Sequence, residues 1–159
     1  MIRFFGGRVM TLANGIETQD IEVWTEGSKI VFVGKPTAEE LDGKVFEREY
    51  DLKGNLLMPS FKNAHTHSAM TFLRSYADDM PLQDWLFKQI FPMEAKLDGE
   101  KVYWLTKLAI LEYLTTGCTA AFDMYFELDD YVKACVESGF RSVLCGAVSG
   151  DKSNLERLE

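Results

Sequence analysis

The sequence predicts an α/β protein built in two parts. Residues 1–58 consist of short apolar runs separated by turn residues, which is typical of small β-sheets. Residues 59–159 instead alternate short apolar runs with helical patterns of ten or more residues. Strand and helix units that alternate in this way build parallel sheets. The boundary between the two parts is expected near Pro59, where the pattern changes.

The first part is expected to be a small antiparallel sheet region with a structural role. Glu26, Gly27 and Ser28 form a turn signal between two apolar runs, and Pro36 follows the second of these runs. Five strands are predicted, at residues 2–11, 21–24, 29–33, 45–51 and 56–58.

Two helices are predicted at the start of the second part. Pro81 can begin a helix over residues 81–91, and Pro92 is expected to end or kink it. A longer helix from residue 98 or 99 to residue 116 is apolar on nearly every face, which predicts burial between other elements. Gly117 is then a natural C-cap.

A strand, a helix and a second strand are predicted next. Small residues form a strand over 118–124, apolar residues recur at helical spacing over 128–136 up to Gly139, and a short apolar strand covers 141–147. Residues 148–159 are expected to form a loop and the first turns of a helix, with Ser153 or Asn154 as its cap.

Charge and composition exclude several classes of partner. The chain has 25 acidic and 17 basic residues, a formal charge of −8, so a nucleic-acid or anionic-membrane surface is not expected. The N-terminus is a poor signal peptide, and no window resembles a membrane-spanning helix. Cys118, Cys135 and Cys145 match neither a disulfide framework nor a metal-binding CxxC motif, which predicts free, buried thiols in a cytoplasmic protein.

Both histidines of the chain lie in one short segment, NAHTHS. If that segment is extended, His65 and His67 point to the same face with Cα atoms roughly 6.5 Å apart. Two imidazoles at this spacing can bind one cation, because metal–nitrogen bonds are only about 2.0 to 2.1 Å long. The alternative is that two histidines in a loop have no shared role. Their position at the end of the first strand of a strand–helix series favours the metal site.

The segment around the histidines resembles a known metal-binding sequence. The run from Asn55 to His67, NLLMPSFKNAHTH, is similar to the metal-binding signature of the amidohydrolase superfamily. The blocks MTFLRSYADD (70–79), PLQDWL (81–86), PMEAKL (92–97) and FDMY (122–125) are similar to the branch that contains 5-methylthioadenosine/S-adenosylhomocysteine deaminases and chlorohydrolases. The resemblance covers essentially the whole chain.

The resemblance implies a fold and an activity for the parent protein. The fold is the N-terminal part of a metal-dependent (β/α)8 TIM barrel over residues 59–159, preceded over residues 1–58 by a small β-sandwich segment. The activity is hydrolytic deamination of a nucleoside or of a purine- or pyrimidine-like ring by metal-activated water. The implied cofactor is Zn²⁺ or another divalent metal such as Fe²⁺. The implied partners are a small-molecule substrate and, for the parent, further copies of itself.

Position by position, the resemblance also implies roles for individual residues. His65 and His67 match metal ligands, and Glu94 matches a glutamate that contacts the substrate. Without the resemblance, Glu94 would be read as a solvated carboxylate at a helix end. Asp123 could orient a loop or a ligand at the barrel mouth, or could cap or form a turn. Trp85 is a candidate pocket residue or a core aromatic.

Two positions depart from the family pattern. Ser60 stands where the family usually has glycine. The family's deaminases also have a substrate-contacting arginine at the end of the third barrel strand, and residues 144–147 contain none. The sequence therefore does not predict S-adenosylhomocysteine or methylthioadenosine as the specific substrate.

The metal site is expected to be incomplete within these 159 residues. Catalytic zinc sites use three or more protein ligands, the chain has no third histidine, and the general acid and base are not identified in it. A (β/α)8 barrel needs about 250 residues. The chain is therefore expected to be an N-terminal fragment that is inactive alone.

Two alternatives stay open from the residues alone. One is a non-catalytic truncated module that associates with a partner chain through its open barrel edge. The other is a small metal-binding protein that uses His65, His67 and a cysteine.

Overall fold

Two units make up the chain, Met1–Pro59 and Ser60–Glu159, and each is described by itself. The computed structural model describes residues 1–13 and 15–146. The segment predicted as a loop and helix start over 148–159, and the last residue of the predicted strand over 141–147, lie outside the described residues. The described part is mixed α/β, as the sequence predicted.

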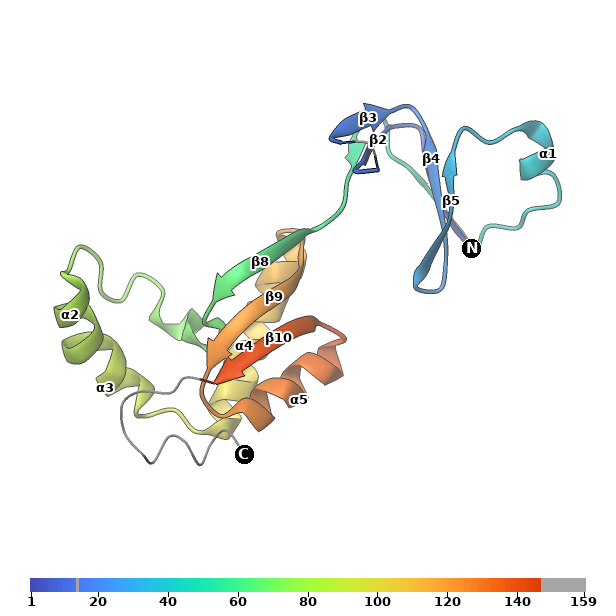
Figure 1. The fold of residues 1–159 in the computed structure, drawn as a ribbon. Coiled ribbons are helices and arrows are strands. Elements are labelled where there is room, and N and C mark those ends of the chain that lie inside the picture. Colours follow the sequence, from blue (N-terminus) through green and yellow to red (C-terminus); the bar gives the residue numbers. More distant parts are fainter. Residues whose placement is uncertain (14, 147–159) are drawn as a thin grey trace. The chain divides into compact units, whose positions relative to one another are not determined.

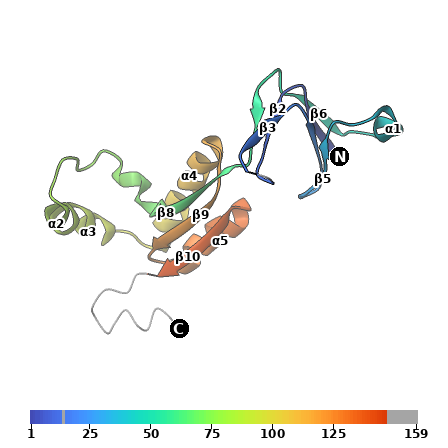
Figure 2. The same cartoon turned by 45° about the horizontal axis from the view of Figure 1, so that its top comes forward.

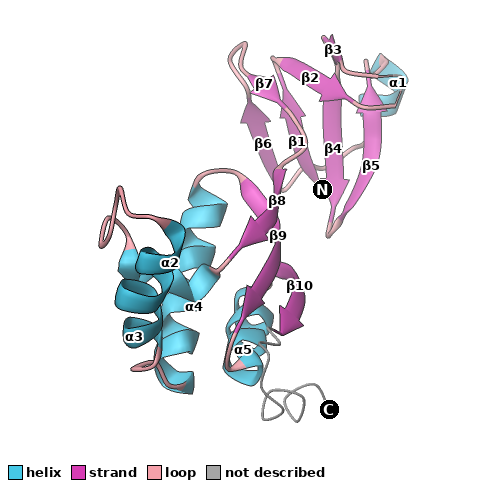
Figure 3. Ribbon diagram, turned by 60° about the vertical axis from the view of Figure 1, so that its left-hand side comes forward, coloured by secondary structure: helices cyan, strands magenta, loops and turns pink. Residues whose placement is uncertain are grey.

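The first unit contains two small sheets. One sheet has the order β5-β4-β1-β6, whose strands lie side by side in Figure 3, and the other has the order β3-β2-β7. Val23 and Trp24 of β4 are buried, and the Trp24 ring stacks on Phe32 of β5 with ring centroids 4.1 Å apart. The elements of this unit are β1 (Ile2–Phe5), β2 (Arg8–Thr11), β3 (Glu17–Gln19), β4 (Glu22–Glu26), β5 (Lys29–Gly34), α1 (Ala38–Leu41), β6 (Arg48–Asp51) and β7 (Leu56–Leu57).

The prediction of a purely antiparallel region is wrong for this unit. β1 pairs in parallel with β6, and β2 pairs in parallel with β7. A parallel pair needs a long crossover connection, and here β4, β5 and α1 lie between β1 and β6 in the chain. The short strand β3 and the helix α1 were not predicted from the sequence.

The single strand predicted over residues 2–11 is two strands in different sheets. The break falls at Gly6, whose φ of +70° is a conformation that residues with a side chain rarely adopt. A Cβ atom at this position would lie 2.3 Å from Oδ1 of Asp51. The chain can therefore change direction here because Gly6 has no side chain.

The second unit is built on a three-stranded parallel sheet with the order β10-β9-β8. The helices α4 and α5 lie side by side on one face of this sheet (Figures 1 and 2). The elements of this unit are β8 (Phe61–Thr66), the 3-10 helix η1 (Ser68–Leu73), α2 (Leu82–Asp84), the π-helix η2 (Trp85–Ile90), α3 (Phe91–Glu94), α4 (Gly99–Thr115), β9 (Cys118–Tyr125), α5 (Leu128–Ser138) and β10 (Arg141–Gly146).

The core of the second unit lies between the sheet and its two helices. It is formed by buried side chains from η1, α4, β9 and α5, and from the residue just before β10. Its members are Ala69, Val102, Ile110, Ala121, Tyr125, Tyr131, Cys135 and Phe140. Because the helices cover only one face, alternate residues of β9 such as Phe122 and Met124 stay exposed in the described structure.

The helix predicted over residues 81–91 continues past Pro92 to Glu94. A π-helix, η2, precedes the proline, and the Phe91 N–H bonds to the Leu86 carbonyl five residues back. Pro92 then occupies the first turn of α3, where its missing N–H is tolerated. The proline therefore changes the type of helix without ending it.

The long helix α4 agrees with the prediction in its bounds but not in its burial. Asp98 caps its N-terminus by accepting from the Lys101 N–H, and Gly117 follows its C-terminus with a φ of +83°. Trp104 and Leu111, however, are about 60% exposed. An apolar composition alone cannot show which elements cover a helix, so the prediction that this helix is buried between other elements is wrong for the described residues.

Among the helices of the described ranges, none is both long enough and apolar enough to cross a membrane.

Ile110 tests the packing of α4 against the sheet. Its side chain is 3% exposed within the core, so Ile110→Ala should reduce the free energy of unfolding by about 2–5 kcal/mol. Ile110→Val removes one methylene and should reduce it by about 0.5–1.5 kcal/mol. Urea unfolding followed by circular dichroism measures both, and equal small losses would contradict the assigned core.

Candidate metal and substrate site

The two histidines lie at the carboxyl end of β8. His65 is within the strand, whereas His67 follows it at the start of η1, with a φ of −133° and a ψ of 77°. Their rings are near one another, with centroids 5.2 Å apart and planes at 76°. The Asn63 side chain accepts a hydrogen bond from the His65 N–H at 3.1 Å, which holds the strand end.

A strand irregularity helps to set this arrangement. Asn63 pairs with Ala121 of β9 and Thr66 pairs with Asp123, so three steps along β8 match two steps along β9. An extra residue of this kind redirects the side chains beside it. The shared face of His65 and His67 therefore does not follow from regular strand alternation, which was the assumption behind the sequence prediction.

One ring nitrogen of His67 is oriented by the neighbouring strand. Nδ1 of His67 lies 2.8 Å from the carbonyl oxygen of Met124 in β9. A carbonyl oxygen can only accept, so Nδ1 carries a proton, and in the neutral ring Nε2 is then the nitrogen with the lone pair. Histidine ligands of metals commonly have this arrangement, with the second nitrogen bonded to a carbonyl or carboxylate. The residues present therefore fit a metal ion on Nε2.

The set of metal ligands is incomplete in the described part of the chain. Over residues 1–13 and 15–146, no group of three or more histidine, cysteine, aspartate or glutamate side chains could hold a metal ion. All three cysteines are free, and none joins the histidines in such a group. Cys118 and Cys135 are buried as predicted, whereas Cys145 is partly exposed.

Asp123 holds the turn that follows His67. It lies inside β9, and its side chain is 0% exposed. Its two carboxylate oxygens lie 3.3 and 3.2 Å from the Ser68 N–H, which donates to them. A buried carboxylate needs such donors to offset its lost hydration. The geometry matches the loop-orienting alternative for Asp123.

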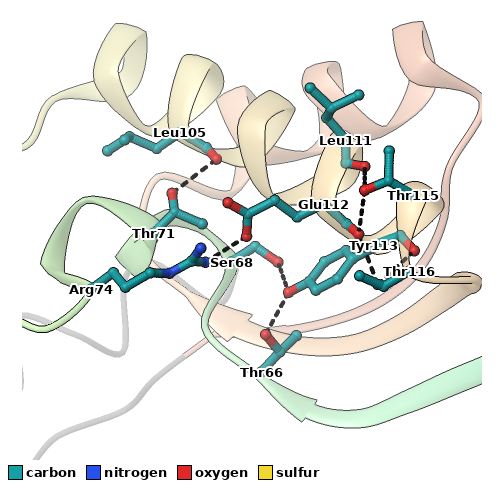
Figure 4. Close-up of polar contacts among 10 residues, drawn as sticks. All are labelled: Thr66, Ser68, Thr71, Arg74, Leu105, Leu111, Glu112, Tyr113, Thr115 and Thr116. Atoms are coloured by element: carbon teal, nitrogen blue, oxygen red, sulfur yellow. Dashed lines mark hydrogen bonds and ion pairs between the residues drawn. The ribbon is translucent and has the colours of Figure 1, made fainter.

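Tyr113 of α4 contacts the same turn from the helix side. Its hydroxyl lies 2.5 Å from the Thr66 hydroxyl and 2.9 Å from the Ser68 hydroxyl (Figure 4). Burial raises the pKa of the Tyr113 phenol, which therefore stays neutral near pH 7. Sequence reasoning missed this residue, because nothing in the helical pattern shows where a tyrosine hydroxyl finds its partners.

Glu94 lines a cavity of about 350 Å³ in the second unit. Tyr125 lines it too, and its buried hydroxyl has no partner within hydrogen-bond distance among the described residues. Burial raises the pKa of Glu94 above its usual value, while the Tyr125 phenol, and His67 whenever its ring is protonated, act to lower it. Glu127 also lines the cavity, and its apolar walls are formed by Phe91, Ala95, Leu97, Val102 and Phe126.

Trp85 is not among the residues that line this cavity. It lies at the start of η2 and borders a separate, open hollow with Leu82 and residues 77–80. The structure therefore brings Glu94 and Tyr125 together at one cavity and places Trp85 at another.

Residues 56–159 match the amidohydrolase family. The chain belongs to this family, as the NLLMPSFKNAHTH run indicated. It is 42% identical to a 5-methylthioadenosine/S-adenosylhomocysteine deaminase of Desulfitobacterium hafniense over 136 residues, which are 86% of this chain and 31% of that protein. It is 52% identical to a 5'-deoxyadenosine deaminase of Methanospirillum hungatei over 108 residues, 67% of this chain and 24% of that protein.

Solved structures agree with the family assignment. The described fold is similar to that of a zinc-bound adenosine deaminase from Xanthomonas campestris, with a TM-score of 0.82, 34% identity, and coverage of 89% of this chain and 33% of that one. A zinc-bound atrazine chlorohydrolase from Arthrobacter aurescens has a TM-score of 0.80 at 22% identity, covers 97% of this chain, and is matched over 37% of its own length. This amidohydrolase chain thus spans about a third of these proteins.

Substitution of Tyr125 tests the electrostatics of the cavity. The Tyr125 hydroxyl makes no hydrogen bond of normal geometry among the described residues, but it lies near the Glu94 carboxyl and lowers its pKa, so Tyr125→Phe should raise that pKa slightly further. Carbon-13 NMR titration of the Glu94 carboxyl measures the shift. Tyr103→Phe is the matched control, since Tyr103 instead hydrogen-bonds Glu137, and it should leave the Glu94 titration unchanged. An unchanged or lower pKa in Tyr125→Phe would contradict the proximity of the two groups.

Proposed function

We propose that this chain forms the N-terminal part of a metal-dependent deaminase that acts on a nucleoside or a related heterocyclic amine. The observation that carries the proposal is the histidine pair, with His67 oriented by the Met124 carbonyl so that Nε2 is available to a metal. Family membership and the similarity to two adenosine-type deaminases support the same reaction class. The proposed fold of the parent is a (β/α)8 barrel with a small β-sandwich.

His65 and His67 would hold a divalent metal, with zinc favoured because two similar structures contain it. A divalent ion at this place lowers the pKa of a bound water and so supplies a nucleophile near neutral pH. The chain's own contribution is to fix the two imidazoles. The Asp123 carboxylate accepts a hydrogen bond from the Ser68 N–H, and the Met124 carbonyl accepts one from the His67 ring.

Glu94 is proposed to bind the substrate. Its carboxylate is a hydrogen-bond acceptor within a cavity that has both polar and apolar walls, which suits the hydroxyl groups of a nucleoside sugar. Phe91 and Phe126 on the cavity wall can pack against apolar parts of the same ligand. Trp85 borders the separate hollow, so we assign it no contact with a ligand bound beside Glu94.

The remaining metal ligands and the general acid and base are proposed to come from other parts of a longer parent protein. The chain spans about a third of the relatives it matches, and its described residues provide two of the three or more ligands that a catalytic site needs. The three free thiols fit a cytoplasmic protein. A homo-oligomeric parent is part of the same proposal.

A non-catalytic module remains the second candidate function. Phe122, Met124 and Val143 are exposed on the face of the sheet opposite the helices, and such a face could bind a partner chain. Both functions require this face to be covered, so its exposure does not separate them. Zinc binding and ammonia release separate them directly.

The first test uses the full-length protein that carries this chain. It should bind zinc and release ammonia from 5'-deoxyadenosine, methylthioadenosine or adenosine, with guanine and cytosine as further candidate substrates. His67→Ala removes a proposed ligand and should lower both the zinc content, measured by atomic absorption, and ammonia release by at least tenfold.

Glu94→Gln is the matched comparison for that experiment. It keeps the shape of the side chain and removes its charge, so it should retain zinc while raising KM for the nucleoside. Full zinc binding and full activity in His67→Ala would refute the proposed metal site. Zinc binding without ammonia release from any heterocyclic amine would favour the non-catalytic module.

The second test uses the 159-residue chain by itself. With two histidine ligands, it should lose zinc during dialysis against a metal-free buffer and should not deaminate nucleosides. Metal analysis of the dialysed chain measures this. Zinc retained at one ion per chain would show that these residues already supply a complete site.

A further inference from the structure

The hydroxyl of Tyr113 connects the two residues that flank His67. It lies 2.5 Å from the hydroxyl of Thr66 on one side and 2.9 Å from that of Ser68 on the other (Figure 4). A tyrosine hydroxyl donates one hydrogen bond and accepts others, so it can serve both partners at once. One atom on α4 therefore restrains the chain immediately before and immediately after the histidine.

The position of the Tyr113 ring is itself fixed by packing. The ring stacks on Phe140, with centroids 5.5 Å apart and planes at 22°, and it packs against the core of the second unit. α4 is 17 residues long and packs against β9 and α5, and these contacts restrain the position of the helix that carries Tyr113. The hydroxyl is thus held at the turn by a ring that has little freedom to move.

The turn depends on this contact because its own backbone is irregular. His67 is neither in β8 nor in η1, and the Ser68 side chain is 2% exposed. Without the phenol, the buried Ser68 hydroxyl would lose its hydrogen bond to Tyr113, and a buried hydroxyl without a partner is unfavourable. The turn would then shift to give that hydroxyl another partner.

Contacts from β9 restrain the same turn at different atoms. Asp123 accepts from the Ser68 main chain, and the Met124 carbonyl accepts from the His67 ring. Neither contact fixes the side chains of Thr66 and Ser68. The contacts from α4 and from β9 are therefore complementary, because β9 restrains the main chain beside the histidine and Tyr113 restrains the side chains on both sides of it.

We propose that Tyr113 is a positioning residue for the metal site, which acts by fixing the turn that presents His67. This inference rests on the proposed role of His65 and His67 as metal ligands. Metal affinity depends on ligand orientation, and loss of an outer contact that orients a ligand typically weakens metal binding about 10- to 100-fold. Tyr113 touches neither metal nor substrate in this arrangement, and its effect passes through Thr66 and Ser68.

The test is the zinc affinity of Tyr113→Phe in the full-length protein. Competition with a chromogenic chelator should give a dissociation constant about tenfold or more above that of the unmodified protein. Cobalt(II) substitution adds a second readout, because a shifted ligand geometry changes the visible absorption bands. Thermal unfolding of the metal-free proteins identifies the temperature range in which both are folded, and affinities are compared there.

Tyr103→Phe is the matched control on the same helix. The hydroxyl of Tyr103 donates to Glu137 of α5 and not to the residues beside His67, so zinc affinity and cobalt bands should not change in this variant. If Tyr113→Phe fails to fold, Thr66→Val is the substitute variant. It removes the Thr66 hydroxyl that contacts the Tyr113 hydroxyl, and it should also weaken zinc binding. Unchanged zinc affinity in the folded Tyr113→Phe variant, or in its Thr66→Val substitute, would overturn the proposal.

His67→Ala in the same assay separates this inference from the proposed function. Weak zinc binding in His67→Ala together with normal binding in Tyr113→Phe would refute only the positioning role. Normal zinc binding in His67→Ala would refute the metal site itself, and the positioning role with it.

Discussion

The parallel pairing of β8 with β9 is the constraint on which the candidate site depends. It places the carboxyl end of β8, with its histidines, beside residues 123–125 of the next strand. The Met124 carbonyl then reaches the His67 ring, and the Asp123 carboxylate reaches the Ser68 main chain. If the two strands were offset by one residue, Asp123 and Met124 would exchange faces, and both contacts would be lost.

Buried polar groups at the strand ends also explain why the helix and the strands of this region have one defined relative position. Asp123 and Ser68 are both almost fully buried, and each has a partner from a different element. Apolar packing alone tolerates small shifts between a helix and a sheet, whereas a buried hydroxyl or carboxylate requires its partner at one distance. Tyr113 supplies such a partner from α4, so the helix and the two strands share one arrangement.

Much of the second unit could be predicted from local patterns. The helix over residues 128–138, its end at Gly139 and the strand that starts at residue 118 follow from spacing and from glycine, because these signals act over a few neighbouring residues. Predictions that required knowledge of distant partners were less successful. The parallel pairing of β1 with β6 and the exposure of Trp104 both depend on elements far away in the chain.

The sequence by itself determined the family, because the NLLMPSFKNAHTH run keeps its characteristic residues at a fixed local spacing, and it predicted His65 and His67 as metal ligands. It could not determine how His67 is oriented or which residues hold it. The extra residue in β8, the Met124 carbonyl, the buried Asp123 and the hydroxyl of Tyr113 meet there only after the strands pair and α4 packs on them. Contacts between residues some 45 to 57 positions apart arise from tertiary folding, and no local pattern encodes them.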